Sequence, residues 1–483
     1  MNDDDQIVLP PNSGPRPIVE GRIDLVIRNN SKVPLEENSQ KLLLELTGGD
    51  KSRAGLDLVA VLDVSGSMSG EKLAKMKEAT KFVVKKLGIV DRFSIVQYSS
   101  KAKRVCRLRQ VTESSRPEFE NMIEALKAGG GTNMEDGLQI GLEVLKQRKF
   151  GKERVGVVML MTDGQENEDS NAAGIDVGDV PVHTFGFGDD QDAKVLKAIA
   201  DNSKLGGTYS DVRLDNLTVA FSLCLGGLLS VVAQDLTLTV SLKEDESTIK
   251  QVTAGRYPQS RDADETSVTI KFGDLYTQEG RKVLVELLLP ASKRKRGADI
   301  LDVAYTYKFE GQTFEANPST VTVRRTDEVK ANQQQPPPEV SAEDVRLGVA
   351  EIIKQATTDA DNNKLESARN KLLEGLKTLQ NGDKQQLKVA LRAELEELHE
   401  LMKSEPIYEK EGRPFAYSLL TSHDSQRQAA RGNDVGKFQL FATPLMREFL
   451  GEPQKFDDIN NLDKYTEEVL KALESVEAII NYI

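Results

Sequence analysis

The fold is decided by one stretch, Leu56-Asp57-Leu58-Val59-Ala60-Val61-Leu62-Asp63-Val64-Ser65-Gly66-Ser67, in which an apolar run ends in a loop of oxygen-bearing side chains. The apolar run predicts a β-strand. Asp63, Ser65 and Ser67 are each two residues apart, so a chain that leaves the strand in extended form turns all three side chains the same way. One loop can therefore supply three ligands to a cation.

Two further loops carry side chains of the same kind. They are Gly129-Gly130-Gly131-Thr132-Asn133 and Met161-Thr162-Asp163-Gly164, and the second follows an apolar strand predicted over residues 155–161. Parallel α/β sheets gather the carboxyl ends of their strands at one edge, where ligands bind. We therefore expect Thr132 and Asp163 to join the first loop. Two carboxylates and three hydroxyls, with no Cys or His nearby, suit Mg²⁺ and discriminate against zinc and copper.

Together the three fragments resemble the von Willebrand factor A domain with its metal-ion-dependent adhesion site. All five motif positions match, and the resemblance runs from about residue 57 to residue 230. It implies a bound divalent ion, Mg²⁺, with Mn²⁺ or Ca²⁺ as alternatives. In the family the aspartate and the two serines of the first loop bind directly, and the threonine and the last aspartate bind directly or through water. The implied metal ligands are Asp63, Ser65, Ser67, Thr132 and Asp163.

Such a site favours protein binding over catalysis. Two carboxylates only neutralise the ion, and Mg²⁺ keeps open or water-filled positions that an Asp or Glu carboxylate of a protein partner could complete. A hydrolase would need a positioned base, a nucleophile or a second metal. His183 alternates with apolar residues in a strand predicted over 182–187, which favours a structural histidine. We therefore predict a metal-dependent protein-binding module or scaffold, and no enzyme.

The middle of the chain alternates predicted strands and helices, which is typical of a doubly wound, mostly parallel α/β sheet. Before and after it, apolar residues recur at every second position, over residues 22–28 and 41–46 and again over 236–242 and 268–272. This period indicates half-buried antiparallel strands. Two N-terminal strands alone could not bury a face. We infer that they complete the later β-sandwich, so that the α/β domain is inserted in it.

A Gln- and Pro-rich linker precedes a C-terminal part that is predicted to be α-helical. Ser341 with Asp344 predicts the cap of its first helix, and apolar stripes beginning at Val345 and Leu387 indicate helices packed in a core. The predicted division is a flexible N-terminus (1–20), N-terminal sandwich strands (21–50), the metal-binding domain (55–230), the β-sandwich (234–326), the linker (327–340) and a helical C-terminal domain (341–483).

Residues 412–432 and the run Thr443-Pro444-Leu445-Met446 resemble the inter-domain region that follows this A domain in plant proteins. Many of those relatives carry a RING finger and act as ubiquitin ligases, while others are described by similarity to inter-alpha-trypsin inhibitor heavy chains. Two distant cysteines, Cys106 and Cys224, cannot make the two-zinc, mostly cysteine RING site. The resemblance therefore implies an alternative function, a non-catalytic subunit or regulator that pairs with a RING-type ubiquitin ligase.

Cysteine usage and hydropathy favour a cytoplasmic protein. Cys106 and Cys224 fall in a predicted strand and a predicted helix, which indicates free thiols in a reducing compartment. Arg104 and Arg107 could activate Cys106 as a nucleophile, but the strand context favours a buried structural thiol. The acidic N-terminus is no signal peptide, and the longest apolar tract, residues 223–233, is too short to span a membrane.

The formal net charge of −13 argues against nucleic acid as the main partner. One basic run, Lys293-Arg294-Lys295-Arg296, lies between two predicted strands and is interpreted as a solvated hairpin tip, with a nuclear-import signal or polyanion contact as the alternative. The acidic residues Glu166, Glu168 and Asp169 follow Asp163. They form either a solvated loop or a surface that selects a partner with basic residues around its metal-binding carboxylate.

Overall fold

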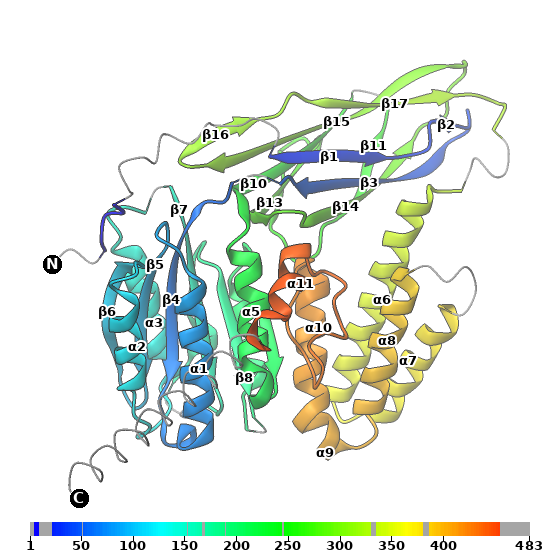
Figure 1. Cartoon of the computed structure of the whole chain (residues 1–483). Helices are drawn as coiled ribbons and strands as arrows, with labels where there is room; N and C mark the ends of the chain where they lie inside the picture. The colour runs from blue at the N-terminus through cyan, green and yellow to red at the C-terminus, as the bar shows by residue number, and fades with distance from the viewer. Residues whose placement is uncertain are drawn as a thin grey trace, which may run out of the picture.

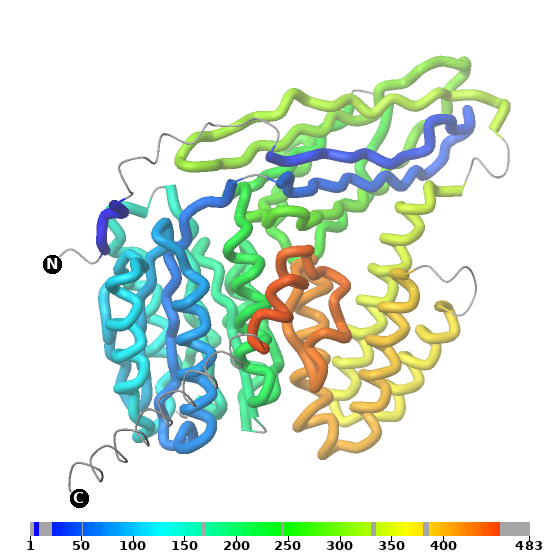
Figure 2. Tube along the Cα trace, in the orientation of Figure 1, coloured from blue at the N-terminus to red at the C-terminus, as the bar shows by residue number. Residues whose placement is uncertain are grey.

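The computed structural model describes residues 4–8, 22–50, 52–151, 153–166, 170–188, 190–243, 246–329, 335–379 and 386–454. Figure 1 shows three parts: an α/β domain, a layer of two β-sheets above it, and a group of helices beside it. In the tube of Figure 2, the N-terminal strands, in blue, lie among the much later green strands of the β-layer. Distant parts of the chain therefore build one sandwich.

The α/β domain is built on a six-stranded sheet in the order β6-β5-β4-β7-β8-β9, in which β6 runs antiparallel to β5 and the other pairs are parallel. Its strands are β4 (Gly55–Asp63), β5 (Arg92–Tyr98), β6 (Ala102–Gln110), β7 (Arg154–Thr162), β8 (Val182–Phe187) and β9 (Tyr209–Val212). Its helices are α1 (Glu71–Lys86), α2 (Arg116–Glu124), α3 (Met134–Lys146), α4 (Ala193–Asn202) and α5 (Leu217–Leu228). The predicted doubly wound, mostly parallel sheet is confirmed.

The central strand β4 is buried on both faces, which is why its sequence is almost continuously apolar. Leu58 and Ala60 belong to one hydrophobic cluster with side chains of α1 and α5, whereas Val59 and Val61 belong to another with α3 and α4. Because successive side chains of a strand point to opposite faces, helices cover the sheet on both sides.

The two β-sheets form a sandwich whose strands come from the chain before the α/β domain and from the chain after it. One sheet has the order β1-β3-β14-β11, and the other has the order β12-β13-β10-β15-β17-β2, with β16 paired to β15. The inserted position of the α/β domain follows, since β3 pairs antiparallel with β14. The strands are β1 (Ile23–Arg28), β2 (Lys32–Val33), β3 (Asn38–Gly48), β10 (Val231–Leu242), β11 (Thr248–Thr253), β12 (Gln259–Arg261), β13 (Ser267–Tyr276), β14 (Gly280–Leu289), β15 (Arg296–Phe309), β16 (Gln312–Glu315) and β17 (Ser319–Arg325).

The described residues of the C-terminal part, 335–379 and 386–454, are largely helical, as predicted, but the first helix begins earlier than expected. Residues 455–483 of the predicted helical domain lie outside the described residues. The predicted cap at Ser341 is wrong, because α6 starts at Pro338 and Pro337 stands before it. Proline suits the first helical position, since its φ is already helical and the N–H it lacks would have no partner there. Asp344 instead accepts from Lys41 Nζ of β3 at 2.8 Å. The helices are α6 (Pro338–Asp361), α7 (Leu365–Thr378), α8 (Gln386–Leu401), α9 (Glu405–Ile407), α10 (Arg413–Ser425) and α11 (Pro444–Leu450).

The segment after α10 joins the parts of the molecule through Arg427. This fully buried guanidinium donates to Glu279 Oε1 at 2.8 Å, to the carbonyl oxygen of Asp274 at 2.7 Å and to that of Gly206 at 3.1 Å. Asp274 and Glu279 belong to the sandwich region, whereas Gly206 precedes β9 of the α/β domain. The Arg427 side chain, from the helical part, therefore forms hydrogen bonds to both the sandwich and the α/β domain.

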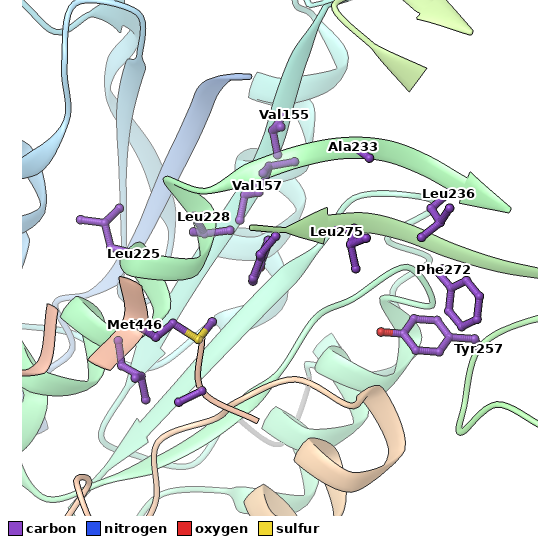
Figure 3. Close-up of a cluster of buried hydrophobic side chains, with 14 of the residues drawn as sticks. Val155, Val157, Leu225, Leu228, Ala233, Leu236, Tyr257, Phe272, Leu275 and Met446 are labelled. Carbon is purple, nitrogen blue, oxygen red and sulfur yellow. The ribbon is translucent and has the colours of Figure 1, made fainter. Parts of the chain in front are cut away.

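A continuous apolar core crosses the same junction. Figure 3 shows Leu225 and Leu228 of α5 near Met446 of α11, with Leu275 of β13 close by. Helix α5 leads directly into β10. Helix α11 packs against α5, as Figure 1 shows. The C-terminal segment therefore covers the connection between the α/β domain and the sandwich.

Residues 4–8, within the predicted flexible N-terminus, lie against the sheet. The Asp5 N–H donates to the Leu108 carbonyl of β6 at 3.0 Å, and Asp4 Oδ2 accepts from Arg92 at 2.7 Å. The remainder of that predicted segment, residues 1–3 and 9–20, lies outside the described residues. Lys293 to Arg296 are exposed where the chain passes from β14 to the start of β15. The predicted hairpin tip is wrong, because β14 and β15 belong to different sheets, so this segment connects the two layers of the sandwich. Among the described residues, no helix is long and apolar enough to cross a membrane.

Candidate metal site

Asp63 is the last residue of β4, and its buried carboxylate is held from two sides. Oδ1 accepts from the Ser65 backbone N–H at 2.8 Å, and Oδ2 accepts from the Thr162 hydroxyl at 2.6 Å. Thr162 ends β7, which pairs in parallel with β4, so the carboxyl ends of both strands lie together. The loop after β4 and the neighbouring strand thus fix one orientation of the carboxylate.

Ser65, Ser67 and Asp163 form a hydrogen-bonded row beside it. The two serine Oγ atoms are 3.0 Å apart, and Ser67 Oγ donates to Asp163 Oδ1 at 2.8 Å. Lys72 Nζ lies 2.5 Å from the second oxygen of Asp163, Oδ2. The structure therefore brings four of the five expected ligands, Asp63, Ser65, Ser67 and Asp163, into one cluster.

The fifth expected ligand, Thr132, follows a glycine loop that is bonded to the first loop. The Gly129 N–H donates to the Val64 carbonyl at 2.8 Å, and the Gly66 N–H donates to the Gly130 carbonyl at 3.0 Å. Gly130 has φ 88°, a conformation that favours glycine. Thr132 is buried, and the next residue, Asn133, caps α3 by accepting from the Asp136 N–H at 3.0 Å. Backbone hydrogen bonds therefore set the Thr132 loop against Asp63 and the serines.

The donor set fits a small cation that prefers oxygen ligands. Among the described residues, no three or more His, Cys, Asp or Glu side chains gather as a metal site, so the candidate depends on two carboxylates with hydroxyls. Burial raises the pKa of Asp63 and the Asp163 charge adds to the shift, although hydrogen bonds from Thr162 and Ser65 oppose it. A bound cation would offset this cost of holding two buried carboxylates together.

Sequence reasoning missed Thr162, Lys72 and Tyr98. Thr162 was within a recognised motif, but its bond to Asp63 depends on the pairing of β4 with β7. The Tyr98 hydroxyl donates to the Met161 carbonyl at 3.1 Å below the site. Lys72 carried a usable signal, because a cation in the first turn of a helix is unfavourable unless an anion holds it.

The acidic loop after Asp163 differs from both expectations where it is described. Glu166 is half-buried, and its Oε1 accepts from the backbone N–H groups of Glu135 and Ala172, each at 3.1 Å. It therefore ties the loop to the start of α3 rather than facing solvent or a partner. Glu168 and Asp169 lie outside the described residues.

His183 lies inside β8, fully buried, and away from the cluster of oxygen ligands. Its Nδ1 is 2.8 Å from the Thr208 hydroxyl oxygen. Burial lowers the pKa of His183 to about 3, and the positive charges of Arg427 and Arg256 add to the shift. The ring is therefore neutral at physiological pH and acts as a structural group, as its alternation with apolar residues predicted.

This lowered pKa predicts acid sensitivity of the fold. The ordinary pKa of histidine is 6.5, and the pKa of the folded His183 is about 3. Between these pH values the unfolded state binds a proton that the folded state does not, so stability falls as the pH falls. Between pH 7 and pH 4.5, the free energy of unfolding should fall in the unchanged chain and in His183→Gln. We expect the fall in His183→Gln to be smaller by about 2–3 kcal/mol, because the variant lacks the buried imidazole. Unfolding by guanidinium chloride at both pH values measures this. Parallel losses in both proteins would contradict a neutral buried ring.

Two regions of the chain match known protein families. Residues 57–220 match the von Willebrand factor type A domain, and residues 385–455 match the region described as VWA / Hh protein intein-like. The chain therefore contains a VWA domain followed by an intein-like region of that kind. The predicted resemblance to a von Willebrand factor A domain is confirmed over residues 57–220, and the predicted resemblance of the C-terminal region to the segment that follows such domains is confirmed over residues 385–455.

Particular relatives extend the comparison. The chain is 31% identical over 271 residues to E3 ubiquitin-protein ligase WAV3 of Arabidopsis thaliana, covering 53% of this chain and 34% of that protein. It is 26% identical over 235 residues to inter-alpha-trypsin inhibitor heavy chain H1 of Mesocricetus auratus, covering 45% and 25%. The chain thus spans about a third or less of these relatives. A solved von Willebrand factor type A structure from Catenulispora acidiphila shares the fold, with a TM-score of 0.65, 18% identity, and coverage of 85% and 97%.

Proposed function

We propose that this chain is a divalent-metal-dependent protein-binding module or scaffold. VWA domains are generally protein-interaction modules, so protein partners follow from the family alone. The observation that carries the metal-dependent part is the gathering of the buried Asp63, Ser65 and Asp163 with the exposed Ser67 in one cluster, with the Thr132 loop bonded beside it. These are oxygen donors at the carboxyl edge of a parallel sheet, where ligands bind.

Each residue has a distinct part in the proposal. Asp63, Ser65 and Ser67 would hold the ion through their side-chain oxygens, and Thr132 and Asp163 would hold it directly or through water. Mg²⁺, with Mn²⁺ and Ca²⁺ as alternatives, supplies a positive centre whose remaining positions accept another oxygen ligand. Because the hydroxyls carry no charge, an Asp or Glu carboxylate of a protein partner suits that position.

The chain in this proposal is not an enzyme and works in the cytoplasm. Burial raises the pKa of Cys106 to about 11 and that of Cys224 to about 12, so both free thiols stay protonated at neutral pH. A protonated thiol is a poor nucleophile, which argues against thioester transfer through Cys106. The similarity to WAV3, named as a ubiquitin ligase, favours one alternative: a non-catalytic regulator of a RING-type ligase complex.

Affinity capture tests the proposal. We expect the full chain, immobilised in Mg²⁺, to retain a set of proteins from cell extract that chelation with EDTA releases. The double variant Ser65→Ala/Ser67→Ala should fail to retain them, because it removes two metal-binding hydroxyls. Quantitative mass spectrometry of the retained proteins measures both effects.

The matched control is Ser69→Ala, since the exposed Ser69 hydroxyl donates to the Gly66 carbonyl in the same loop without joining the cluster. It should retain the same proteins as the unchanged chain. A ubiquitin ligase retained equally with and without EDTA would favour the alternative function. Identical sets in every condition would refute metal-dependent binding.

A further inference from the structure

Lys72 stands out as a cation in a position that a helix does not favour. It is the second residue of α1, where the partial positive charge of the helix start opposes an ammonium group. Its Nζ nevertheless lies 2.5 Å from Asp163 Oδ2, and the Asp163 side chain is fully buried while that of Lys72 is 29% exposed. A specific attraction to Asp163 therefore holds the ammonium in place.

This ion pair uses the carboxylate that a metal ion would need. Ser67 donates to Asp163 Oδ1, and Lys72 donates to Asp163 Oδ2. Both oxygens of the Asp163 carboxylate therefore already accept a hydrogen bond. Asp63, which is also buried, lies in the same cluster and adds a second negative charge. Lys72 thus supplies positive charge at the place where a divalent ion would supply it.

We propose that Lys72 is a tethered competitor cation that regulates the metal site, neutralising Asp163 until a divalent ion displaces it. The inference rests on the proposed metal-dependent function and deepens it. Two consequences follow. The metal-free chain does not carry two uncompensated buried carboxylates, and the affinity for Mg²⁺ is set below the value that the oxygen ligands alone would give.

The surroundings of Lys72 provide a place for the displaced ammonium. Lys72 lines a polar pocket of about 740 Å³ that is also lined by Asp190 and Asp215, both exposed, and by Arg213. The Arg213 guanidinium is paired with Glu411 at 2.7 Å. Gly188 also lines this pocket, and a Cβ placed on it would be 3.6 Å from Lys72 Nζ, an ordinary contact distance. The pocket therefore gives the displaced lysine a place to turn, away from Asp163 and toward Asp190 and Asp215.

Calorimetric titration of the full chain with MgCl₂ tests the proposal. We expect Lys72→Met to bind Mg²⁺ at least about tenfold more tightly than the unchanged chain, because a like charge beside the ion is removed. Lys72→Arg keeps the charge and should stay within about threefold of the unchanged chain on the same grounds. The control is Lys75→Met, since Lys75 lies on the same helix but pairs with Glu78 at 3.5 Å, away from the cluster.

Thermal unfolding gives a second measurement. In EDTA, Lys72→Met should melt at a lower temperature than the unchanged chain, because Asp163 loses its counter-charge. Saturating Mg²⁺ should raise the melting temperature of this variant more than that of the unchanged chain. A lysine with a merely structural role would lower stability but would not tighten Mg²⁺ binding.

The outcomes separate the inference from the proposed function. If the unchanged chain binds Mg²⁺ and Lys72→Met binds it equally or more weakly, the competitor role is wrong while the metal site stands. If Mg²⁺ binds only after Lys72 is replaced, the competitor role is supported and the unchanged chain is not a magnesium-dependent binder. If neither protein binds Mg²⁺, both proposals fail.

Discussion

Replacing Asp63 by alanine is expected to abolish Mg²⁺ binding while the chain stays folded. Asp63 is a charged and fully buried expected ligand, and its carboxylate is oriented by hydrogen bonds from the Ser65 N–H and the Thr162 hydroxyl. Residues that only support metal ligands typically change affinity by about 10–100-fold, so losing a charged ligand should exceed that range. The fold should lose only about 1–3 kcal/mol, the usual cost of leaving buried donors such as the Thr162 hydroxyl without an acceptor.

Calorimetric titration with circular dichroism checks both halves of this expectation. Asp63→Asn is the informative companion variant, because it keeps the volume and one carbonyl oxygen but removes the charge, and it should also bind Mg²⁺ poorly. Ser69→Ala, in the same loop but outside the cluster, should bind Mg²⁺ like the unchanged chain. Unaltered Mg²⁺ affinity in a folded Asp63→Ala protein would overturn the assignment of the metal site.

The largest expected effect on stability comes from Asp57, at the opposite end of β4. Its carboxylate is fully buried and accepts from three guanidinium groups: Arg92 at 2.6 and 2.8 Å, Arg148 at 2.8 Å and Arg154 at 2.6 Å. Burial alone would raise the pKa of Asp57, but the hydrogen bond from Arg92 and the three positive charges lower it below its ordinary value. Asp57→Asn should destabilise the α/β domain by about 3–5 kcal/mol, because buried cations lose their counter-charge.

Unfolding by guanidinium chloride, followed by circular dichroism, measures this loss. The control is Glu118→Gln, which breaks an exposed ion pair with Arg109 and should change the free energy of unfolding little, because solvent screens surface pairs. The remaining folded Asp57→Asn protein should still bind Mg²⁺, since Asp57 and Asp63 lie at opposite ends of the same strand. A loss as small as that of the control would mean that the arginines find other partners.

Several elements of the fold were predictable because their signals are local. The strand β8 has the bounds expected from its apolar alternation, residues 182–187, and β7 extends one residue beyond the expected 155–161 at each end. The start of α6 was mistaken, because Ser341 and Asp344 imitate a cap while Pro338 already fits the first helical position. Local patterns therefore gave the type of each element more securely than its ends.

The sequence by itself determined the doubly wound sheet, its insertion in a sandwich and the loops that carry the oxygen side chains. These features follow from periods of apolar residues and from the rule that parallel strands end at one edge. Only the tertiary structure decided which side chains pair across that edge and between the parts of the molecule. Lys72 meets Asp163, and Arg427 meets Glu279, through contacts between residues far apart in the chain. Such pairs depend on how helices and sheets pack in three dimensions, and no periodicity along the sequence records that packing.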